Sequence, residues 1–218
     1  MKHFRFLIVC LLAIVSGCSQ YIKDTGSTIK EAFTGLPDAI VTSEKVTSLP
    51  YASIYARVND GPRVFMVLAF TELNPSTGSM KLKWLSSDGA MIATENGRVV
   101  KTLLLPSHNL LNFSGSSPIH VSGLESMSWQ ASYDWQPGYH FNQQASIQSS
   151  VIGKELITSL IWQKETQKVA ETVTVSNTNK TYKNIFWIDQ QGIVVKSKQW
   201  AIPEHLKIEL EVLKPYKG

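Results

Sequence analysis

Cysteine is scarce in this chain of 218 residues, which contains Cys10 and Cys18 and no other. Everything after residue 18 therefore lacks a thiol, so no internal disulfide can stabilise a domain there. The roughly 200 residues that follow are enough for one domain with a sizeable apolar core, and that core must supply its stability.

Neither sign of charge dominates the sequence. The 21 lysines and arginines exceed the 17 aspartates and glutamates by a net charge of +4, and two of the basic side chains, Lys2 and Arg5, lie in the first few residues. The clustered basic face that binds nucleic acid is missing, so we expect no nucleic-acid partner.

Long hydrophobic runs are also lacking. The longest, residues 6–15, has about ten residues, whereas a membrane-spanning helix needs roughly 20. Lys2 and Arg5 precede this run, and Ser16 and Gly17 follow it. This layout is typical of a secretory signal peptide. We therefore interpret residues 1–17 as a signal segment and not as a buried core helix.

The residues Val15-Ser16-Gly17-Cys18 resemble the lipobox at which bacterial lipoproteins are processed. In that chemistry the thiol of the cysteine takes a diacylglyceryl group, the chain is cut before the cysteine, and the new amine is acylated. Two or three acyl chains anchor a protein stably. We expect lipid on Cys18 as the only attached group. Ser19, in place of an inner-membrane aspartate signal, favours the outer membrane, and we expect the protein on its periplasmic face.

Residues 18–48 are predicted to form a tether, with Thr25 or Ser27 capping a short helix that runs to Phe33 and stops at Gly35. Residues 49–218 then read as strands, because β-branched and aromatic runs alternate with turn signals such as Asp88-Gly89 and Asn96-Gly97. The predicted strands are 51–58, 63–71, 80–86, 90–94, 98–105, 126–135, 139–147, 156–164, 168–176, 181–189, 193–201 and 206–213.

Two of these strands alternate cleanly between apolar and polar residues, 127–135 and 206–212, which puts one face on a core and the other in water. Residues 64–70 are apolar throughout and are predicted to be covered on both faces. No βαβ spacing occurs. The fold class is therefore mainly β, an antiparallel, barrel-like single domain. A membrane-spanning barrel is disfavoured because several strands are too short.

The order of several segments resembles the YjbF/GfcB family of lipoproteins: 49–57, 67–70, 82–89, 94–102, 129–135 and 181–188. The resemblance implies a barrel-like β fold and a role in assembly or export of group 4 capsule or related exopolysaccharide. It also implies two partners from the same operons, an outer-membrane β-barrel protein and the polysaccharide-export channel. It brings no catalytic residues.

Motifs for catalysis or metal binding are missing. No G-x-S-x-G elbow occurs, and residues 114–117 are a serine-rich loop without a neighbouring base. The histidines after residue 18, which are His108, His120, His140 and His205, show no metal-ligand spacing, so we expect no metal. His140 is more readily an ordinary surface or core residue than a base. Glu125, Asp134 and Asp189 lie near aromatic residues, but a glycosidase needs two carboxylates roughly 5–10 Å apart.

Aromatic and arginine side chains are the remaining candidates for a binding site. Trp and Tyr stack on sugar rings and donate hydrogen bonds, although the alternation of 129–135 favours inward-facing, barrel-filling aromatics. Trp135 and Tyr139 flank a turn and are the ones expected to be exposed. Arg57 and Arg98 could contact an anionic sugar or pair with a carboxylate inside the barrel.

Three hypotheses follow. The first is a non-enzymatic accessory lipoprotein that docks on a partner protein or a polysaccharide. The second is a polysaccharide-modifying enzyme, which predicts two close carboxylates with perturbed pKa values. The third is a carrier of a small ligand, which predicts a large apolar cavity in the barrel.

Overall fold

The computed structural model describes residues 37–115 and 126–217. The predicted signal segment, Cys18 and the predicted helix that ends at Phe33 lie outside this range. In the part of the chain that is described, no helix is both long and apolar enough to cross a lipid bilayer.

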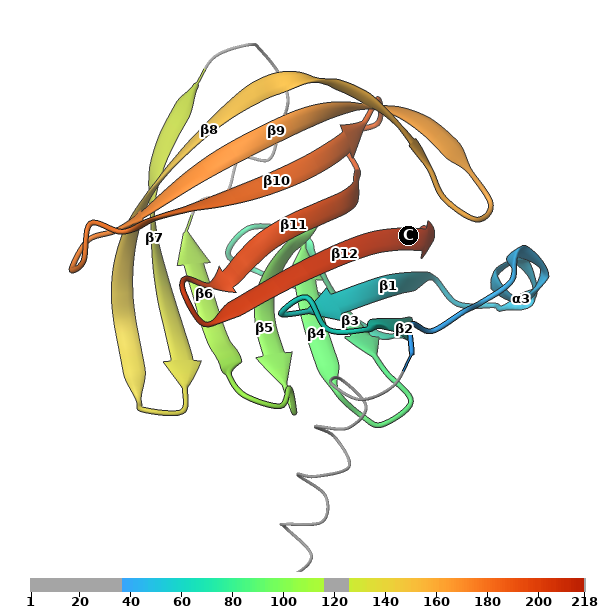
Figure 1. The fold of residues 1–218 in the computed structure, drawn as a ribbon, viewed down its shortest axis with the longest axis horizontal. Helices are drawn as coiled ribbons and strands as arrows, with labels where there is room; N and C mark the ends of the chain where they lie inside the picture. The colour runs from blue at the N-terminus through green and yellow to red at the C-terminus, as the bar shows by residue number, and fades with distance from the viewer. Residues whose placement is uncertain (1–36, 116–125, 218) are drawn as a thin grey trace, which may run out of the picture.

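Within the described residues, twelve antiparallel strands form one sheet in the order β5-β4-β3-β2-β1-β12-β11-β10-β9-β8-β7-β6, and the sheet curls into a nearly closed barrel (Figure 1). Mainly β, antiparallel and barrel-like architecture is therefore confirmed. The strands are β1 (Ser53–Val58), β2 (Arg63–Leu73), β3 (Met80–Leu85), β4 (Met91–Glu95), β5 (Arg98–Leu103), β6 (Asn109–Gly115), β7 (Met127–Gln136), β8 (His140–Thr158), β9 (Gln163–Val175), β10 (Thr181–Asp189), β11 (Val194–Ile202) and β12 (Leu206–Lys214).

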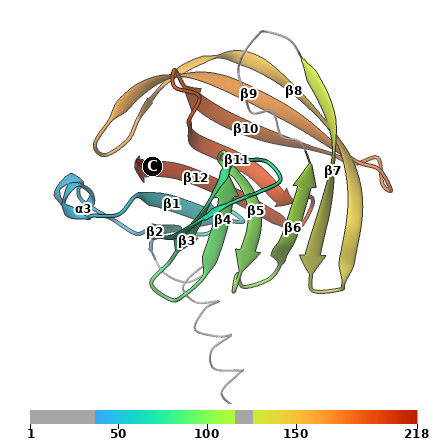
Figure 2. The ribbon, with the colours of Figure 1, turned by 180° about the vertical axis from the view of Figure 1, so that it is seen from behind.

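The two outer strands of the sheet, β5 and β6, lie side by side and close the barrel without a backbone ladder between them (Figure 2). Side chains bridge them instead. The Thr102 hydroxyl accepts the backbone N–H of Leu110 at 2.9 Å, and the Asn109 side chain bonds to both backbone groups of Leu105. Exposed strand edges invite pairing with other chains, and this arrangement covers part of the edge.

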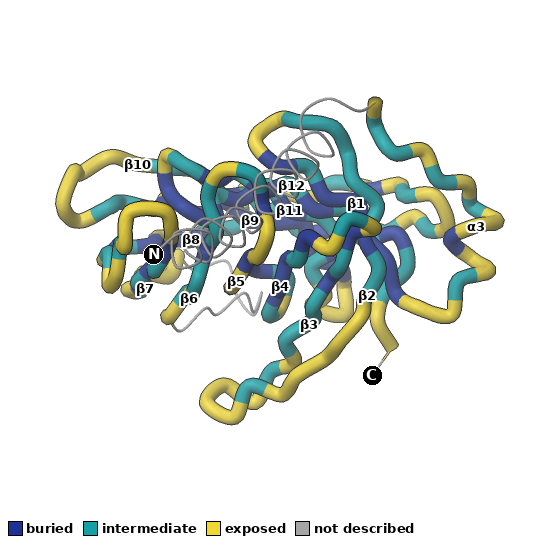
Figure 3. The backbone as a smooth tube through the Cα atoms, turned by 90° about the horizontal axis from the view of Figure 1, so that it is seen from below, coloured by how far each residue is buried: buried dark blue, intermediate teal, exposed yellow. Residues whose placement is uncertain are grey.

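The main core fills the barrel interior from the inward faces of the strands. Along β12 the buried residues Leu206, Ile208 and Leu210 alternate with partly exposed ones, as the sequence predicts. Figure 3 shows buried and less buried residues following one another along the strands. The period of two therefore decides which side chains face the interior.

A short helix, α3 (Ser43–Ser48), covers one outer patch of the barrel. Thr42 caps it, its hydroxyl accepting the backbone N–H of Lys45, and Val46 packs with Tyr55 and Leu213. This helix lies later than the one predicted to end at Phe33.

Three sequence predictions about strands are wrong. Residues 64–70 are not covered on both faces, because Phe70 is 63% exposed. Strand β2 pairs with β1 only up to Val67 and extends past the end of that pairing. The predicted strand 156–164 spans a hairpin turn, since β8 continues through a bulge near Gly153 to Thr158. Strand β6 was not predicted at all.

Candidate functional site

Two cavities open at opposite ends of the barrel. In an antiparallel barrel, successive hairpin turns alternate between the two ends. One cavity lies among the β7–β8, β9–β10 and β11–β12 turns, and the other lies beside the β4–β5 and β10–β11 turns. The two sites therefore have no wall in common.

The first cavity, here called the aromatic pocket, has a volume of about 190 Å³. Its floor is buried, and its rim is formed by exposed or partly exposed polar side chains from the turns. The lining residues are Tyr133, Trp135, His140, Gln143, Gln144, Ala145, Val175, Asn177, Thr178, Tyr182, Pro203, Glu204 and His205.

Trp135 lies at the centre of a row of stacked rings. The imidazole of His140 stacks on the indole with ring centroids 4.7 Å apart, and His205 tilts against the indole at 6.1 Å. His108 stacks on His205 at 4.7 Å. Four rings from three separate parts of the chain are thereby brought together.

Trp135 is only 8% exposed, so the expectation that it lies at the surface is wrong. The alternation of β7 continues to its end, and it turns Ala131, Tyr133 and Trp135 into the barrel. Tyr139 is 87% exposed, as expected for its place in the turn, and does not line the aromatic pocket.

Two hydrogen-bond donors in the floor of the aromatic pocket have no partner among the described residues: the Tyr133 hydroxyl and the Trp135 indole N–H. Burial raises the pKa of Tyr133 far above its usual range, so the hydroxyl keeps its proton. An unsatisfied buried polar group costs about 1–3 kcal/mol. Buried groups of this kind are normally met by water or by a ligand.

The rim of the aromatic pocket carries a carboxylate and side-chain amides. Glu204 receives a hydrogen bond from Lys180, which is the main reason that its pKa is lowered, and its other oxygen accepts the Tyr182 hydroxyl at 3.5 Å. The amide of Asn177 donates to Gln143 at 3.4 Å. Charge and planar amides thus surround a floor of aromatic rings.

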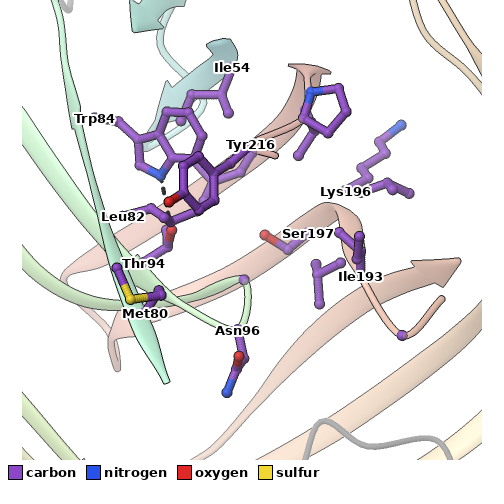
Figure 4. A pocket seen from close by; sticks show the side chains of 17 residues that line it. Ile54, Met80, Leu82, Trp84, Thr94, Asn96, Ile193, Lys196, Ser197 and Tyr216 are labelled. Carbon is purple, nitrogen blue, oxygen red and sulfur yellow. Dashed lines mark hydrogen bonds between the residues drawn. The ribbon is translucent and has the colours of Figure 1, made fainter. Parts of the chain in front are cut away.

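The second cavity, here called the apolar cavity, has a volume of about 370 Å³ (Figure 4). Trp84 lies in its wall, but the indole N–H donates to the Thr94 hydroxyl at 2.9 Å and is satisfied. The Ser197 hydroxyl accepts a hydrogen bond from Gln199. The other lining residues are Ile54, Met80, Leu82, Asn96, Gly97, Gly192, Ile193, Val194, Val195, Lys196, Leu210, Val212, Pro215 and Tyr216.

Arg98, proposed from sequence as a sugar contact or an internal ion pair, lies inside the barrel. Its guanidinium and the Glu171 carboxylate form an ion pair in which both side chains are 3% exposed. The rings of Phe113, Trp129 and Phe186 surround the guanidinium at 5.0–5.3 Å. Arg98 therefore lines neither cavity, and its ion pair agrees with the predicted alternative of an internal pair.

Arg57 lies on the outside of the barrel and holds the chain that leads into it. Its guanidinium pairs with Asp38 at 3.0 Å, and Arg63 pairs with the same carboxylate at 3.1 Å. Asp38 also accepts the backbone N–H of Arg63, which is the main reason that its pKa is lowered. Neither Arg57 nor Arg98 joins Trp135 in the aromatic pocket.

The carboxylates considered for glycoside hydrolysis are not brought together. Glu125 lies outside the described residues. Asp134 accepts the backbone N–H of Asn142 at 2.7 Å, at the β7–β8 turn. Asp189 accepts two backbone N–H groups of the β10–β11 turn and pairs with Lys164. Over residues 37–115 and 126–217, no cluster of three or more potential metal ligands occurs.

Sequence reasoning missed most of the aromatic pocket. Gln143, Gln144, Glu204 and His205 carried no motif, because residues from three separate turns meet only after the sheet has curled. The one available signal was the alternation of β7, which places Tyr133 and Trp135 on the same inward face.

Residues 26–213 match a family profile described as group 4 capsule polysaccharide lipoprotein GfcB, YjbF. The chain belongs to this family. It is 30% identical over 227 residues to the uncharacterized lipoprotein GfcB of Escherichia coli K12, covering 97% of this chain and 99% of GfcB. It is 28% identical over 222 residues to the uncharacterized lipoprotein YjbF of the same organism, with both chains fully covered.

The chain is also similar to a crystal structure, that of the hypothetical lipoprotein YmcC from Escherichia coli K12. It superposes on this chain with a TM-score of 0.70 and 30% identity, covering 82% of this chain and 91% of YmcC. The predicted resemblance to the YjbF/GfcB family is therefore confirmed. The family is one of capsule-polysaccharide lipoproteins.

Proposed function

We propose that this lipoprotein is a non-enzymatic accessory factor in the assembly or export of a group 4-like capsule or a related exopolysaccharide. The observation that carries the proposal is the family match over residues 26–213, whose description names a capsule polysaccharide. The protein would act by docking, with its barrel presented to a polysaccharide or to a partner of the export machinery.

The surroundings of the carboxylates support a binding role over a catalytic one. A general acid in a glycosidase needs a raised pKa. Among the described residues, the carboxyl groups with shifted pKa values are all lowered, for example Glu155 by its hydrogen bond from Lys168 and Glu72 by its hydrogen bond from Lys83. These are structural ion pairs of a surface, not the two unequal carboxylates of an active site.

Location and partners extend the same proposal. Cleavage before Cys18 and acylation of that residue would anchor the barrel, and Ser19 favours the outer membrane, where the protein would lie on the periplasmic face. The partners would be the outer-membrane β-barrel protein and the export channel encoded with the polysaccharide genes.

Deletion of the gene tests the proposal in a strain that expresses the polysaccharide genes. We expect loss of surface polysaccharide, measured by extraction and sugar analysis, and its recovery with the wild-type gene. A Cys18→Ala variant should fail to complement and should leave the membrane fraction. Unchanged surface polysaccharide in the deletion strain would contradict the accessory role.

A second candidate function, transport or storage of a lipid acyl chain, is favoured by the apolar cavity. Its volume of about 370 Å³ falls within the roughly 300–1,000 Å³ of small-molecule sites, and two polar side chains of its wall, Trp84 and Thr94, are paired with each other. N-phenylnaphthylamine should bind, lauric acid should displace it, and Leu82→Trp should abolish binding by filling the cavity. A Leu103→Trp control lies at an exposed position. Equal dye binding by both variants would remove this candidate.

A further inference from the structure

We propose that the aromatic pocket binds a single sugar residue of a polysaccharide chain, with the Tyr133 hydroxyl and the Trp135 indole N–H as its hydrogen-bond donors. This inference rests on the proposed function and gives it a site. The site lies among the three turns β7–β8, β9–β10 and β11–β12, seen on the left of Figure 1.

The two donors are the first argument. Both side chains are more than nine-tenths buried, both line the pocket, and neither donor atom has a partner among the described residues. A site built to hydrogen-bond a hydroxyl-rich ligand leaves such groups unmatched when it is empty.

The composition of the walls is the second argument. Ala145 and Val175 present apolar surface to the C–H face of a sugar ring, beside the rings of Trp135 and His140. The rim adds carboxylate and amide groups from Glu204, Gln144 and Asn177, which can bond to hydroxyls at the ring edge. An apolar floor with a few convergent polar groups is the usual form of a small-ligand site.

The size and position of the pocket set the length of glycan that enters it. Its volume of about 190 Å³ holds roughly six water molecules, at about 30 Å³ each. That is room for one ring, not for a long segment. The rim residues Gln144, Asn177, Thr178 and Glu204 are exposed, so neighbouring sugars of the same polymer would extend over the turns into solvent.

The apolar cavity at the other end of the barrel makes the contrast clear. Its tryptophan donor is satisfied within the wall, whereas that of Trp135 is not. The aromatic pocket thus offers a ligand an indole donor that the apolar cavity does not.

The test uses the full-length lipoprotein in detergent micelles and isothermal titration with short oligosaccharides. These are prepared by partial hydrolysis of the surface polysaccharide of the producing strain, with dextran oligomers as an unrelated control. We expect saturable binding of the strain's own oligosaccharides. Tyr133→Phe should weaken it by about tenfold, the loss of one hydrogen bond, and Trp135→Phe should weaken it further.

The matched control is Trp84→Phe, which removes the same kind of indole N–H from the apolar cavity and should leave the affinity unchanged. Tyr133→Phe removes one oxygen atom and keeps the ring, so the variant should fold like the wild type. Circular dichroism verifies this. No binding of the strain's oligosaccharides, or equal affinity of wild type and Tyr133→Phe, overturns the inference.

The same reagents separate this inference from the proposed function. If deletion of the gene abolishes surface polysaccharide while the purified protein binds no oligosaccharide, the accessory role stands and the sugar site fails. If the oligosaccharides bind through Tyr133 while deletion leaves the polysaccharide intact, the site stands and the accessory role fails.

Discussion

At the scale of single residues, the most unusual feature is the buried ion pair between Arg98 and Glu171. Asn184 donates a further hydrogen bond to the Glu171 carboxylate at 3.3 Å, and aromatic rings cover the guanidinium. Removing two charges from water is costly, so such a pair tolerates the loss of both charges better than the loss of one.

Arg98→Met should therefore lower the free energy of unfolding by about 3–5 kcal/mol, because it leaves Glu171 charged and buried without its cation. The double variant Arg98→Met with Glu171→Gln should recover much of that loss. Urea denaturation of the three proteins measures the effect. A double variant that is less stable than Arg98→Met would show that Glu171 is stabilised by something other than this pair.

A second prediction for a single residue concerns Tyr133→Phe, which should raise stability where Arg98→Met lowers it. The variant removes a buried hydroxyl that has no partner and keeps the ring packing, so the ligand-free protein should be more stable by up to about 1 kcal/mol. Thermal unfolding without oligosaccharide measures it. A clear loss of stability would mean that the hydroxyl already has a bound water or another partner in the free protein.

At the scale of elements, the turns determine how closely the strands approach across the barrel. Asn96 and Gly97 both have positive φ, at 50° and 80°, which is the backbone that the sequence pair Asn-Gly predicts for a two-residue hairpin turn. Gly97 also lies against Val194 of β11, so its missing side chain lets the β4–β5 turn close over the apolar cavity.

Gly97→Ala should therefore destabilise the barrel more than Gly89→Ala. Both glycines have positive φ, and the left-handed backbone alone costs about 1–2 kcal/mol for alanine. A Cβ at Gly97 would also lie 2.3 Å from the Val194 Cβ, whereas a Cβ at Gly89 would meet nothing within 4 Å. Chemical denaturation of the pair measures the difference. Equal losses would mean that β11 moves aside freely.

The limits of sequence-based prediction are clearest in β8 and β6. Strand 181–189 was placed correctly because its β-rich run ends at a turn signal on each side. Strand β8 was divided because Gly153 and the polar residues around it suggest a break, yet tertiary pairing with β9 carries the strand through a bulge. Strand β6 was missed because its short run, 109–115, is neither alternating nor β-branched, and its pairing with β7 fixes it.

At the scale of the whole molecule, the architecture could be predicted and the binding surfaces could not. Alternation and turn chemistry need only local sequence, and they were enough for an antiparallel barrel. The aromatic pocket depends on how the sheet curls, which brings His108 and His205 into contact across about a hundred residues. The alternation of apolar and polar residues along β7 predicts that Trp135 is buried, whereas its place beside a turn predicts that it is exposed. The alternation is correct.

His108 makes the stability of the barrel depend on pH. Desolvation, and then the charges of His205 and His140, lower the pKa of His108 below its usual value near 6.5. On acidification, His108 therefore takes up a proton in the unfolded chain before it does so in the folded protein. The contribution of His108 to the free energy of unfolding is complete above about pH 6.5 and is lost as the pH falls below that value. We expect a lower melting temperature at pH 5.5 than at pH 7.5.

His108→Gln should reduce that difference, because the substituted side chain does not titrate. Differential scanning calorimetry of both proteins across this pH range measures it. Identical pH dependence in the two proteins would place the effect on other groups.

The ion pairs of Asp38 with Arg57 and Arg63 have a mechanical consequence. The backbone N–H of Ala39 also donates to the carbonyl of Arg63, so the incoming chain is clipped to β2 before it reaches α3 and β1. If Cys18 is held in a membrane, a force that pulls the barrel away from the membrane would act on these contacts of Asp38 and Ala39 before it reaches β1. Asp38 would then take up a pulling force from the membrane anchor and keep it from separating β1 from its neighbouring strands.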